Sequence, residues 1–231
     1  MALTDNLLAF YKLDNLTDSS GNGNTLTNNG DVTFSSGKIG NAAVFDGSNY
    51  LSSTGNAVLG TGDFSVAGWV NATNLDSYQK MYYVGGSNGF TISLRDGILH
   101  TAKANVADLY DFNSSDIANN SWFHLLVKRS GAIFTAYVNG QSIGTYDSGD
   151  VIEFTADSQF IGAYIDGLEG YSLEGQIDAV GIWNRALSDA EVAALYNSGA
   201  GLEEFGGAPQ TQSFVKLLDT VKFFGKVKFM P

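Results

Sequence analysis

Short runs rich in Val, Ile, Phe, Tyr and Trp recur along the chain, and Gly, Asn, Asp and Ser separate them. In residues 64–70 (FSVAGWV), Phe64, Val66 and Val70 share one face of an extended chain. Residues 122–129 (WFHLLVKR) alternate in the same way. Many such runs with dense turn signals predict an all-β sandwich or barrel of about a dozen strands.

Two dipeptides mark tight turns between alternating runs. Asn139-Gly140 follows the run 133–138 (IFTAYV), and Asp96-Gly97 lies between TISLR and ILHTA. Both central residues of a type I′ turn need a positive φ, which Asn, Asp and Gly adopt most readily. Each dipeptide therefore predicts a β-hairpin.

One segment has helical rather than strand periodicity. In residues 187–199 (LSDAEVAALYNSG), Ser188 can cap a first turn and Glu191 follows three positions later, which is the spacing of a capping box. Gly199 can end the helix. We therefore expect one short helix near residues 188–198.

Charge and cysteine content exclude several functions. The formal net charge is −12, and residues 209–231 contain four lysines and one aspartate, so residues 1–208 carry −15. An acidic body argues against a nucleic-acid partner, because phosphate binding needs a basic surface. The chain has no cysteine, which excludes disulfides, thiolate catalysis and Cys-ligated zinc.

Two further absences concern membranes and export. No window approaches about 18 uninterrupted apolar residues, so we expect no membrane span. The N-terminus (MALTDNLLAFYKLDNL) lacks a basic region followed by a long apolar region, so we expect no signal peptide.

Several segments occur in an order that resembles one family. They are 7–30 (LLAFYKLDNLTDSSGNGNTLTNNG), 37–51 (GKIGNAAVFDGSNYL), 64–71 (FSVAGWVN), 122–144 (WFHLLVKRSGAIFTAYVNGQSIG) and 175–199 (GQIDAVGIWNRALSDAEVAALYNSG). This succession resembles the laminin-G-like jelly rolls of the concanavalin A-like lectin/glucanase superfamily. The resemblance implies a two-sheet antiparallel jelly-roll sandwich whose first and last strands lie near each other.

We divide the chain into three parts. Residues 1–199 are expected to form the jelly roll, all-β except for the short helix. Residues 200–213 (AGLEEFGGAPQTQS) have little apolar periodicity and are expected to be a linker. Residues 214–231 form a C-terminal extension.

The C-terminal extension (FVKLLDTVKFFGKVKFMP) is basic and two-faced. Its even positions carry Lys216, Lys222, Lys226 and Lys228, and its odd positions carry Val215, Leu217, Val221, Phe223, Val227 and Phe229. The alternation favours a strand, although Phe214, Leu217, Leu218, Val221 and Phe224 also fit helical spacing. An apolar strip of this kind needs cover. We therefore expect an assembly tail that docks on other protein subunits.

The segment 18–24 (DSSGNGN) has two interpretations. Asn, Gly, Asp and Ser are typical turn residues, and oxygen-bearing side chains also suit calcium. The family resemblance implies a structural Ca²⁺ held by Asp18, Asn22 and Asp178. Asp178 lies among apolar residues, where an unpaired carboxylate is costly. We therefore expect a cation or Arg185 to compensate its negative charge.

No catalytic residues are expected. Similar enzymes of the superfamily that cleave β-glucans carry a Glu-x-Asp-x-x-Glu strand, and this sequence has none. Glu169 and Glu174 are five positions apart and face opposite sides of a regular strand. His100 and His124 are expected to be ordinary strand residues. We therefore expect a protein that is not an enzyme.

Aromatic side chains are candidates for stacking on sugars. The residues concerned are Tyr82, Tyr83, Tyr110, Tyr164 and Tyr171. The alternative for each of them is packing within or between the sheets.

Three functions follow from these features. The first is a structural and adhesion module of a larger assembly, such as a virion (a phage capsid decoration or a tail or fibre protein), which docks through its tail and contacts glycans. It would act at a virion or extracellular surface. The second is a free, calcium-assisted carbohydrate-binding lectin, and the third is a glycoside hydrolase. We favour the first.

Overall fold

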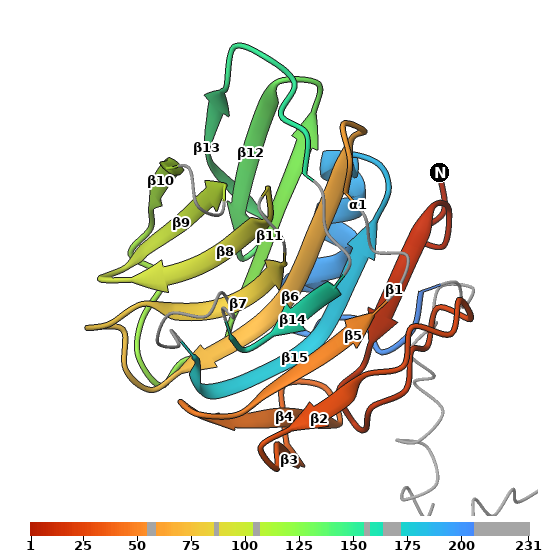
Figure 1. Ribbon diagram of the computed structural model, residues 1–231, viewed down its shortest axis with the longest axis vertical. Helices are drawn as coiled ribbons and strands as arrows, with labels where there is room; N and C mark the ends of the chain where they lie inside the picture. The colour runs from red at the N-terminus through yellow and green to blue at the C-terminus, as the bar shows by residue number, and fades with distance from the viewer. Residues whose placement is uncertain (55–58, 86–87, 104–106, 155–157, 164–171, 206–231) are drawn as a thin grey trace, which may run out of the picture.

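The computed structural model describes residues 1–54, 59–85, 88–103, 107–154, 158–163 and 172–205. These residues form two stacked antiparallel sheets and one short α-helix (Figure 1). The predicted fold class is therefore confirmed. No helix among the described residues is long and apolar enough to cross a membrane.

Sheet A is formed by eight strands in the order β13-β12-β11-β6-β15-β4-β3, and β1 also pairs with β15. They are β1 (Leu7–Tyr11), β3 (Thr33–Ser36), β4 (Asn41–Asp46), β6 (Phe64–Ala72), β11 (Phe123–Ser130), β12 (Ile133–Val138), β13 (Gln141–Asp147) and β15 (Glu174–Trp183). In the pairing of β1 with β15, Leu7 lies opposite Trp183 and Tyr11 opposite Val180. The first and last strands are therefore neighbours, as the family resemblance implied.

Sheet B is formed by seven strands in the order β10-β9-β8-β7-β14-β5-β2. They are β2 (Thr27–Asn29), β5 (Tyr50–Thr54), β7 (Gln79–Val84), β8 (Phe90–Arg95), β9 (Ile98–Lys103), β10 (Ala107–Asn113) and β14 (Ser158–Ile161).

Both predicted hairpins are confirmed. Asp96 and Gly97 join β8 to β9 with φ values of 54° and 76°. Asn139 and Gly140 join β12 to β13 with φ values of 50° and 75°. In both turns the two central residues have the positive φ that a type I′ turn requires.

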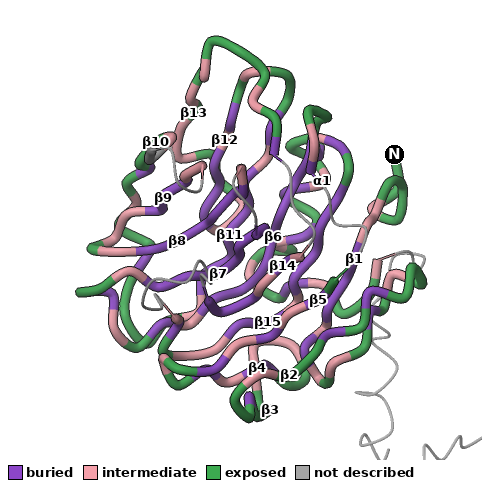
Figure 2. Tube along the Cα trace, in the orientation of Figure 1, coloured by how far each residue is buried: buried purple, intermediate pink, exposed green. Residues whose placement is uncertain are grey.

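The main core lies between the sheets. Alternate residues of β6 (Phe64, Val66 and Val70) meet alternate residues of β8 (Phe90, Ile92 and Leu94) in one buried cluster. Figure 2 shows that buried residues follow the strands and that exposed residues gather at the turns. The alternation predicted for residues 64–70 therefore decides which side chains reach the core.

The outer face of sheet A has its own apolar cover. Helix α1 (Asp189–Tyr196) packs Val192 and Leu195 against Ala67 and Trp183. Ser188 and Glu191 form the predicted capping box. The helix ends at Asn197, which has a φ of 48°, and the 3₁₀ turn Asn197–Gly199 follows.

The described part of the expected linker packs on the sandwich. Leu202 and Phe205 contact the apolar cluster beneath helix α1. Phe205 stacks on Phe10 of β1 with ring centroids 3.8 Å apart. The aromatic and aliphatic side chains of this segment therefore hold residues 200–205 against sheet A. Residues 206–213 and all ten residues named for the assembly tail lie outside the described residues.

Candidate functional site

The face of sheet B that points away from the core carries a polar row of side chains. Because Phe90, Ile92 and Leu94 of β8 point into the core, the residues between them point outward. Antiparallel pairing aligns Lys80 of β7, Ser93 of β8, His100 of β9 and Asp111 of β10. We call these four residues the polar row.

An ion pair or hydrogen bond joins the last two members of the polar row. Asp111 Oδ1 lies 2.6 Å from His100 Nδ1. The side chain of His100 is 3% exposed, whereas that of Asp111 is 49% exposed. The imidazole thereby holds one carboxylate oxygen in place while the carboxylate remains within reach of a ligand.

Tyr78 and Arg95 lie beside the polar row. The guanidinium carbon of Arg95 lies 4.3 Å from the centre of the Tyr78 ring, and the His100 ring meets Tyr78 edge-on at 5.0 Å. Arg95 is partly exposed, and its Nε lies 3.4 Å from Asp96 Oδ2. Tyr78, Arg95 and Asp111 thus combine an aromatic ring, a donor fork and an acceptor pair. This combination suits the apolar faces and hydroxyl groups of a sugar.

A polar hollow begins where the row ends. It has a volume of about 370 Å³ and is lined by Asp96, Gly97, Asn113, Ser114, Ser115 and Ile117. Asp96 follows Arg95 directly, and Asn113 lies two residues after Asp111 on β10. The hollow therefore lies at the end of β8 and β10 that is next to Arg95 and Asp111.

An aromatic row crosses the same face on neighbouring strands. Tyr83 stacks on Phe160 of β14 at 5.6 Å, and Phe160 lies 6.0 Å from Tyr50 of β5. Phe160 and Tyr50 are half-buried. This row supplies further apolar surface next to the polar row.

Two of the tyrosines predicted to contact ligands are buried. Tyr82 points into the core with no exposed surface, and its hydroxyl lies 3.2 Å from Gln159 Oε1. Tyr83 is only 1% exposed. Strand alternation and cross-strand stacking bury both rings, so ligand contact at Tyr82 and Tyr83 stays a prediction that their burial does not favour.

Of the three remaining tyrosines, Tyr110 is the one that the structure describes. It is exposed and stacks on Tyr146 at 5.0 Å, so it bridges the edge strands β10 and β13 of the two sheets. Tyr164 and Tyr171 lie outside the described residues. Tyr110 therefore remains a predicted contact at the edge of the sandwich.

The polar loop 18–24 covers the free edge of β1. Asp18 Oδ1 accepts hydrogen bonds from the amides of Phe10 and Ser20, and its Oδ2 accepts one from the amide of Asn24. Asn22 donates to the carbonyl of Leu7 at 2.8 Å. These bonds satisfy backbone groups that an edge strand leaves unpaired. They account for the polarity of the loop without a metal ion.

Asp178 is placed elsewhere, beneath the turn between β3 and β4. It has no exposed surface, its Oδ2 accepts a hydrogen bond from the Ile39 amide at 2.8 Å, and its Oδ1 has no partner among the described residues. Gly37 is required here, because a Cβ at that position would lie 2.7 Å from Asp178 Oδ2. Asp14 binds the same turn through the Asn41 amide.

The environment of Asp178 disfavours its charged form. Burial raises its pKa to about 7, against the effect of the Ile39 and Lys38 amides, and the charge of Asp14 raises it further. Arg185 does not pair with the Asp178 carboxylate. It forms an ion pair with Glu191 instead, with Arg185 Nη2 2.7 Å from Glu191 Oε1. The alternative of an Asp178–Arg185 pair is therefore wrong.

The three predicted calcium ligands are held by different parts of the fold. Asp18 and Asn22 are engaged by the β1 edge, and Asp178 is held by the turn at residues 37–41. Among the residues that the structure describes, no group of three or more His, Cys, Asp or Glu side chains is placed to hold a metal. Asp178 is the one of the three that retains a buried oxygen suited to a cation.

Both histidines lie on strands, as predicted. His124 on β11 packs against Trp69 and Tyr196, and burial lowers its pKa to about 3. His100 belongs to the candidate site, which sequence reasoning missed together with Tyr78, Arg95 and Asp111. The alternation of apolar residues in β8 indicates that Ser93 and Arg95 point outward, but the sequence does not indicate that His100 pairs with Asp111.

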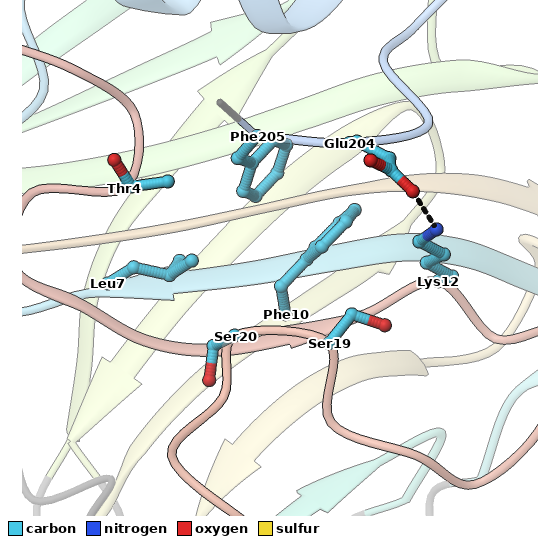
Figure 3. Close-up of a pocket in the computed structure, with 8 residues that line it drawn as sticks. All are labelled: Thr4, Leu7, Phe10, Lys12, Ser19, Ser20, Glu204 and Phe205. Carbon is cyan, nitrogen blue, oxygen red and sulfur yellow. Dashed lines mark hydrogen bonds and ion pairs between the residues drawn. The ribbon is translucent and has the colours of Figure 1, made fainter. Parts of the chain in front are cut away.

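A second hollow lies over the outer side of sheet A (Figure 3). It has a volume of about 380 Å³ and is lined by Thr4, Leu7, Phe10, Lys12, Ser19, Ser20, Glu204 and Phe205. Figure 3 shows the Leu7, Phe10 and Phe205 side chains around its centre and the Lys12–Glu204 pair at its rim.

Comparison with known proteins relates the chain to one family. A laminin-G-like family described as the concanavalin A-like lectin/glucanases superfamily matches residues 45–193. No curated protein matches the chain.

Solved structures share the fold at low sequence identity. The binding domain of Paraclostridial Mosquitocidal Protein 1 has a TM-score of 0.70 and 21% identity, over 85% of this chain and 53% of that one. Domain 4 of AbnA has a TM-score of 0.65 and 24% identity, over 85% of this chain and 98% of that one. AbnA is a GH43 extracellular arabinanase from Geobacillus stearothermophilus, and this domain was solved with arabinotriose.

A neurotoxin domain is similar to the same extent. The binding domain of botulinum neurotoxin DC, solved with rat synaptotagmin II, has a TM-score of 0.67 and 16% identity, over 85% of this chain and 52% of that one. The chain thus spans about half the length of the two toxin domains. Identities below one quarter show a shared fold.

Proposed function

The chain belongs to the concanavalin A-like lectin/glucanases superfamily, and on this premise we propose that it is a non-enzymatic module that binds glycans. The binding surface is formed by the partly exposed side chains of Asp111, Tyr78 and Arg95, which lie over the buried members of the polar row. The observation that carries the proposal is the cluster of Tyr78, Arg95 and Asp111 above the buried His100.

The chemistry of this cluster matches a sugar. An aromatic ring offers apolar contact to the C–H groups of a pyranose or furanose. The Arg95 guanidinium donates in a fixed planar geometry, and the Asp111 carboxylate accepts from hydroxyl groups. The adjoining hollow of about 370 Å³ falls in the range of small-molecule sites.

The carboxylates at this face do not suit glycoside hydrolysis. That reaction needs a carboxylic acid in an apolar setting and a second carboxylate across the scissile bond. Asp96 and Asp111 are 59% and 49% exposed, so neither lies in an apolar setting. Asp178 has a raised pKa but no exposed surface, and Glu169 lies outside the described residues. We therefore infer a role in binding alone.

Similar structures support a binding role without deciding it. The toxin domains are named as binding domains, and the arabinanase domain was solved with arabinotriose. Those ligands belong to those proteins. For this chain they support the choice of glycans as the first ligands to test.

A glycan array followed by calorimetry tests the proposal. We expect the full chain to bind at least one glycan class, and Asp111→Ala with Arg95→Ala to abolish that binding. Ser142→Ala on the exposed edge strand β13 is the matched control. Absence of binding to every glycan, or undiminished binding by the double variant, would contradict the proposal.

We further propose that the module works within a larger assembly, such as a virion surface, and docks through residues 214–231. The support is the charge difference between the basic tail and the acidic body. Sedimentation of chains with and without residues 209–231 tests this. Loss of self-association or of incorporation into particles is expected on truncation, and unchanged assembly would contradict the docking role.

A second candidate is a lectin that calcium stabilises. Two observations favour it: Asp178 Oδ1 is buried and has no partner within the described ranges, and the Asp14 carboxylate lies nearby. These two residues would hold the ion, which would supply charge compensation to the 37–41 turn. Loss of glycan binding on chelation would favour this candidate over the calcium-independent one.

A further inference from the structure

The apolar cover over the outer face of sheet A has a gap. Helix α1 covers one part of that face, and residues 200–205 and the N-terminal segment cover another. Between Thr4, Leu7 and Phe205 the hollow of Figure 3 remains open. Leu7 and Phe205 keep part of their apolar surface uncovered at this hollow.

The floor of this hollow is rigidly held. Phe205 stacks on Phe10 at 3.8 Å and lies 5.3 Å from the Trp183 ring. Phe10 is itself buried, so its ring is fixed between the sheet and Phe205. The hollow is therefore preformed, and a ligand group that enters it does not have to order these rings.

The rim of the hollow is polar. Lys12 Nζ binds Glu204 Oε1 at 3.0 Å, and both residues line the hollow. The exposed Glu203 lines a neighbouring hollow that shares Phe10 and Lys12 with this one. Residues 1–208 carry a net charge of −15, so a ligand with apolar side chains flanked by positive charges would complement the acidic body around the hollow.

We propose that the hollow receives apolar side chains of the C-terminal segment 214–229 of this protein. That segment alternates Val, Leu and Phe with lysine, which matches the partly exposed Leu7 and Phe205 side chains of the hollow and the acidic body around it. The proposal names the body surface that the assembly tail recognises, so its biological meaning rests on the proposed assembly role.

The position of Phe205 supports this occupant. Phe205 lines the hollow and is the last described residue, so the segment starts from the rim of the site. Residues 206–213 separate it from Phe214 and reach about 30 Å when extended. A tether of this length gives an effective concentration in the millimolar range. The tail of the same chain and that of a neighbouring chain are both able to reach the hollow.

Disulfide trapping tests the proposal, because the chain has no cysteine of its own. Ser19→Cys is placed on the hollow, where Ser19 is exposed and its hydroxyl has no partner among the described residues. It is combined in turn with Phe214→Cys, Leu217→Cys and Val221→Cys. The matched control replaces Ser19→Cys by Ser142→Cys on β13, the far edge strand of sheet A.

Under mild oxidation we expect at least one Ser19→Cys pair to cross-link about tenfold faster than its Ser142→Cys control, since docking raises the local concentration of the tail at the hollow. Equal rates for all three pairs would overturn the proposal. Mass spectrometry of the product then shows whether the cross-linked tail belongs to the same chain or to another chain. Cross-links between chains support the assembly role, and cross-links only within a chain would refute that role while leaving the docking site intact.

A blocking variant gives an independent readout. Thr4→Trp fills the hollow from an exposed lining position, and Thr33→Trp on β3 is the exposed control. We expect Thr4→Trp to lower the Ser19→Cys cross-linking rate to the Ser142→Cys level, whereas Thr33→Trp leaves it unchanged. An unchanged rate in Thr4→Trp would contradict docking in the hollow.

Discussion

Asp111 of β10 lies directly opposite His100 of β9, with Asp111 Oδ1 2.6 Å from His100 Nδ1. The imidazole is buried and the carboxylate is half exposed, so the pair crosses from the interior to the surface. Tyr78 and Arg95 contact each other beside this pair. The candidate site is thus supported from below by a buried polar residue, which keeps its surface groups in place.

The Tyr78 ring should hold the sugar-binding groups around it in place. Arg95 and Lys80 both lie over this ring, at 4.3 Å and 5.2 Å from its centre. Tyr78→Ala removes this support, so we expect affinity for the glycan found by array to fall about tenfold, or ~1.4 kcal/mol. Tyr78→Phe keeps the ring and should retain most of the affinity. Calorimetry measures both, with Ser142→Ala on the exposed strand β13 as the control. Equal losses in Tyr78→Ala and Ser142→Ala would argue against the assigned face.

The bond between Asp111 and His100 should matter for folding as well as for binding. Asp111→Ala leaves His100 Nδ1 buried without a partner, so we expect a loss of about 1–3 kcal/mol in the free energy of unfolding. Asp111→Asn keeps an acceptor and should lose less. Urea unfolding gives these values, and a double-mutant cycle with His100→Gln isolates the pair. A coupling energy near zero would show that the contact is not formed in solution.

Local signals in the sequence predicted the strands, the hairpins and the helix. The alternation of Phe64, Val66 and Val70 selects the core face of β6, and the Ser188–Glu191 capping box starts the helix. The Asp96-Gly97 turn also fixes the register that places Ser93 beside His100. These features could be predicted because each depends on residues close together in the chain.

Long-range pairing accounts for what could not be predicted. His100 meets Asp111 across β9 and β10, where no two-residue turn signal fixes the register. Asp18 was open to two interpretations because its partner is the edge of β1, and the sequence does not show which edge is free. The amide that binds Asp178 belongs to a turn 139 positions away. Such contacts depend on topology rather than on local pattern.

Asp178 should make stability depend on both pH and calcium. Its pKa is about 7 in the folded protein and close to 3.9 when unfolded, so the folded state holds the extra proton between these values. The free energy of unfolding should therefore fall as the pH rises from about 4 to 7. Asp178→Asn should remove this slope, which urea unfolding across that range measures. An identical slope in the variant would contradict the assignment.

Above pH 7, where Asp178 is charged in the folded protein, bound calcium should offset the cost of burying this charge. If Asp14 and Asp178 hold the ion, about 5 mM Ca²⁺ should raise Tm at pH 8 by about 2–4 °C in the parent chain, which corresponds to roughly 1 kcal/mol for a domain of this size. Asp178→Asn should not respond. Scanning calorimetry with chelator and with Mg²⁺ supplies the controls. An equal response in both chains would place calcium elsewhere.

His124 should destabilise the fold in acid. The free energy of unfolding should fall as the pH falls, which is the opposite of the pH dependence expected for Asp178. Burial lowers its pKa to about 3 from an ordinary value of 6.5, so between these values the unfolded chain binds a proton that the folded protein excludes. Stability is therefore retained above pH 6.5 and lost as the pH falls toward 3, by up to a few kcal/mol. His124→Phe keeps the packing against Trp69 and Tyr196 and has no such proton.

Unfolding by urea at several pH values between about 3 and 7 measures this effect. We expect the difference in unfolding free energy between His124→Phe and the parent chain to grow steadily as the pH falls. Because Asp178 titrates over part of the same range with the reverse slope, the comparison is repeated in the Asp178→Asn background. A constant difference in both backgrounds would mean that the imidazole is protonated, or reached by water, in the folded protein.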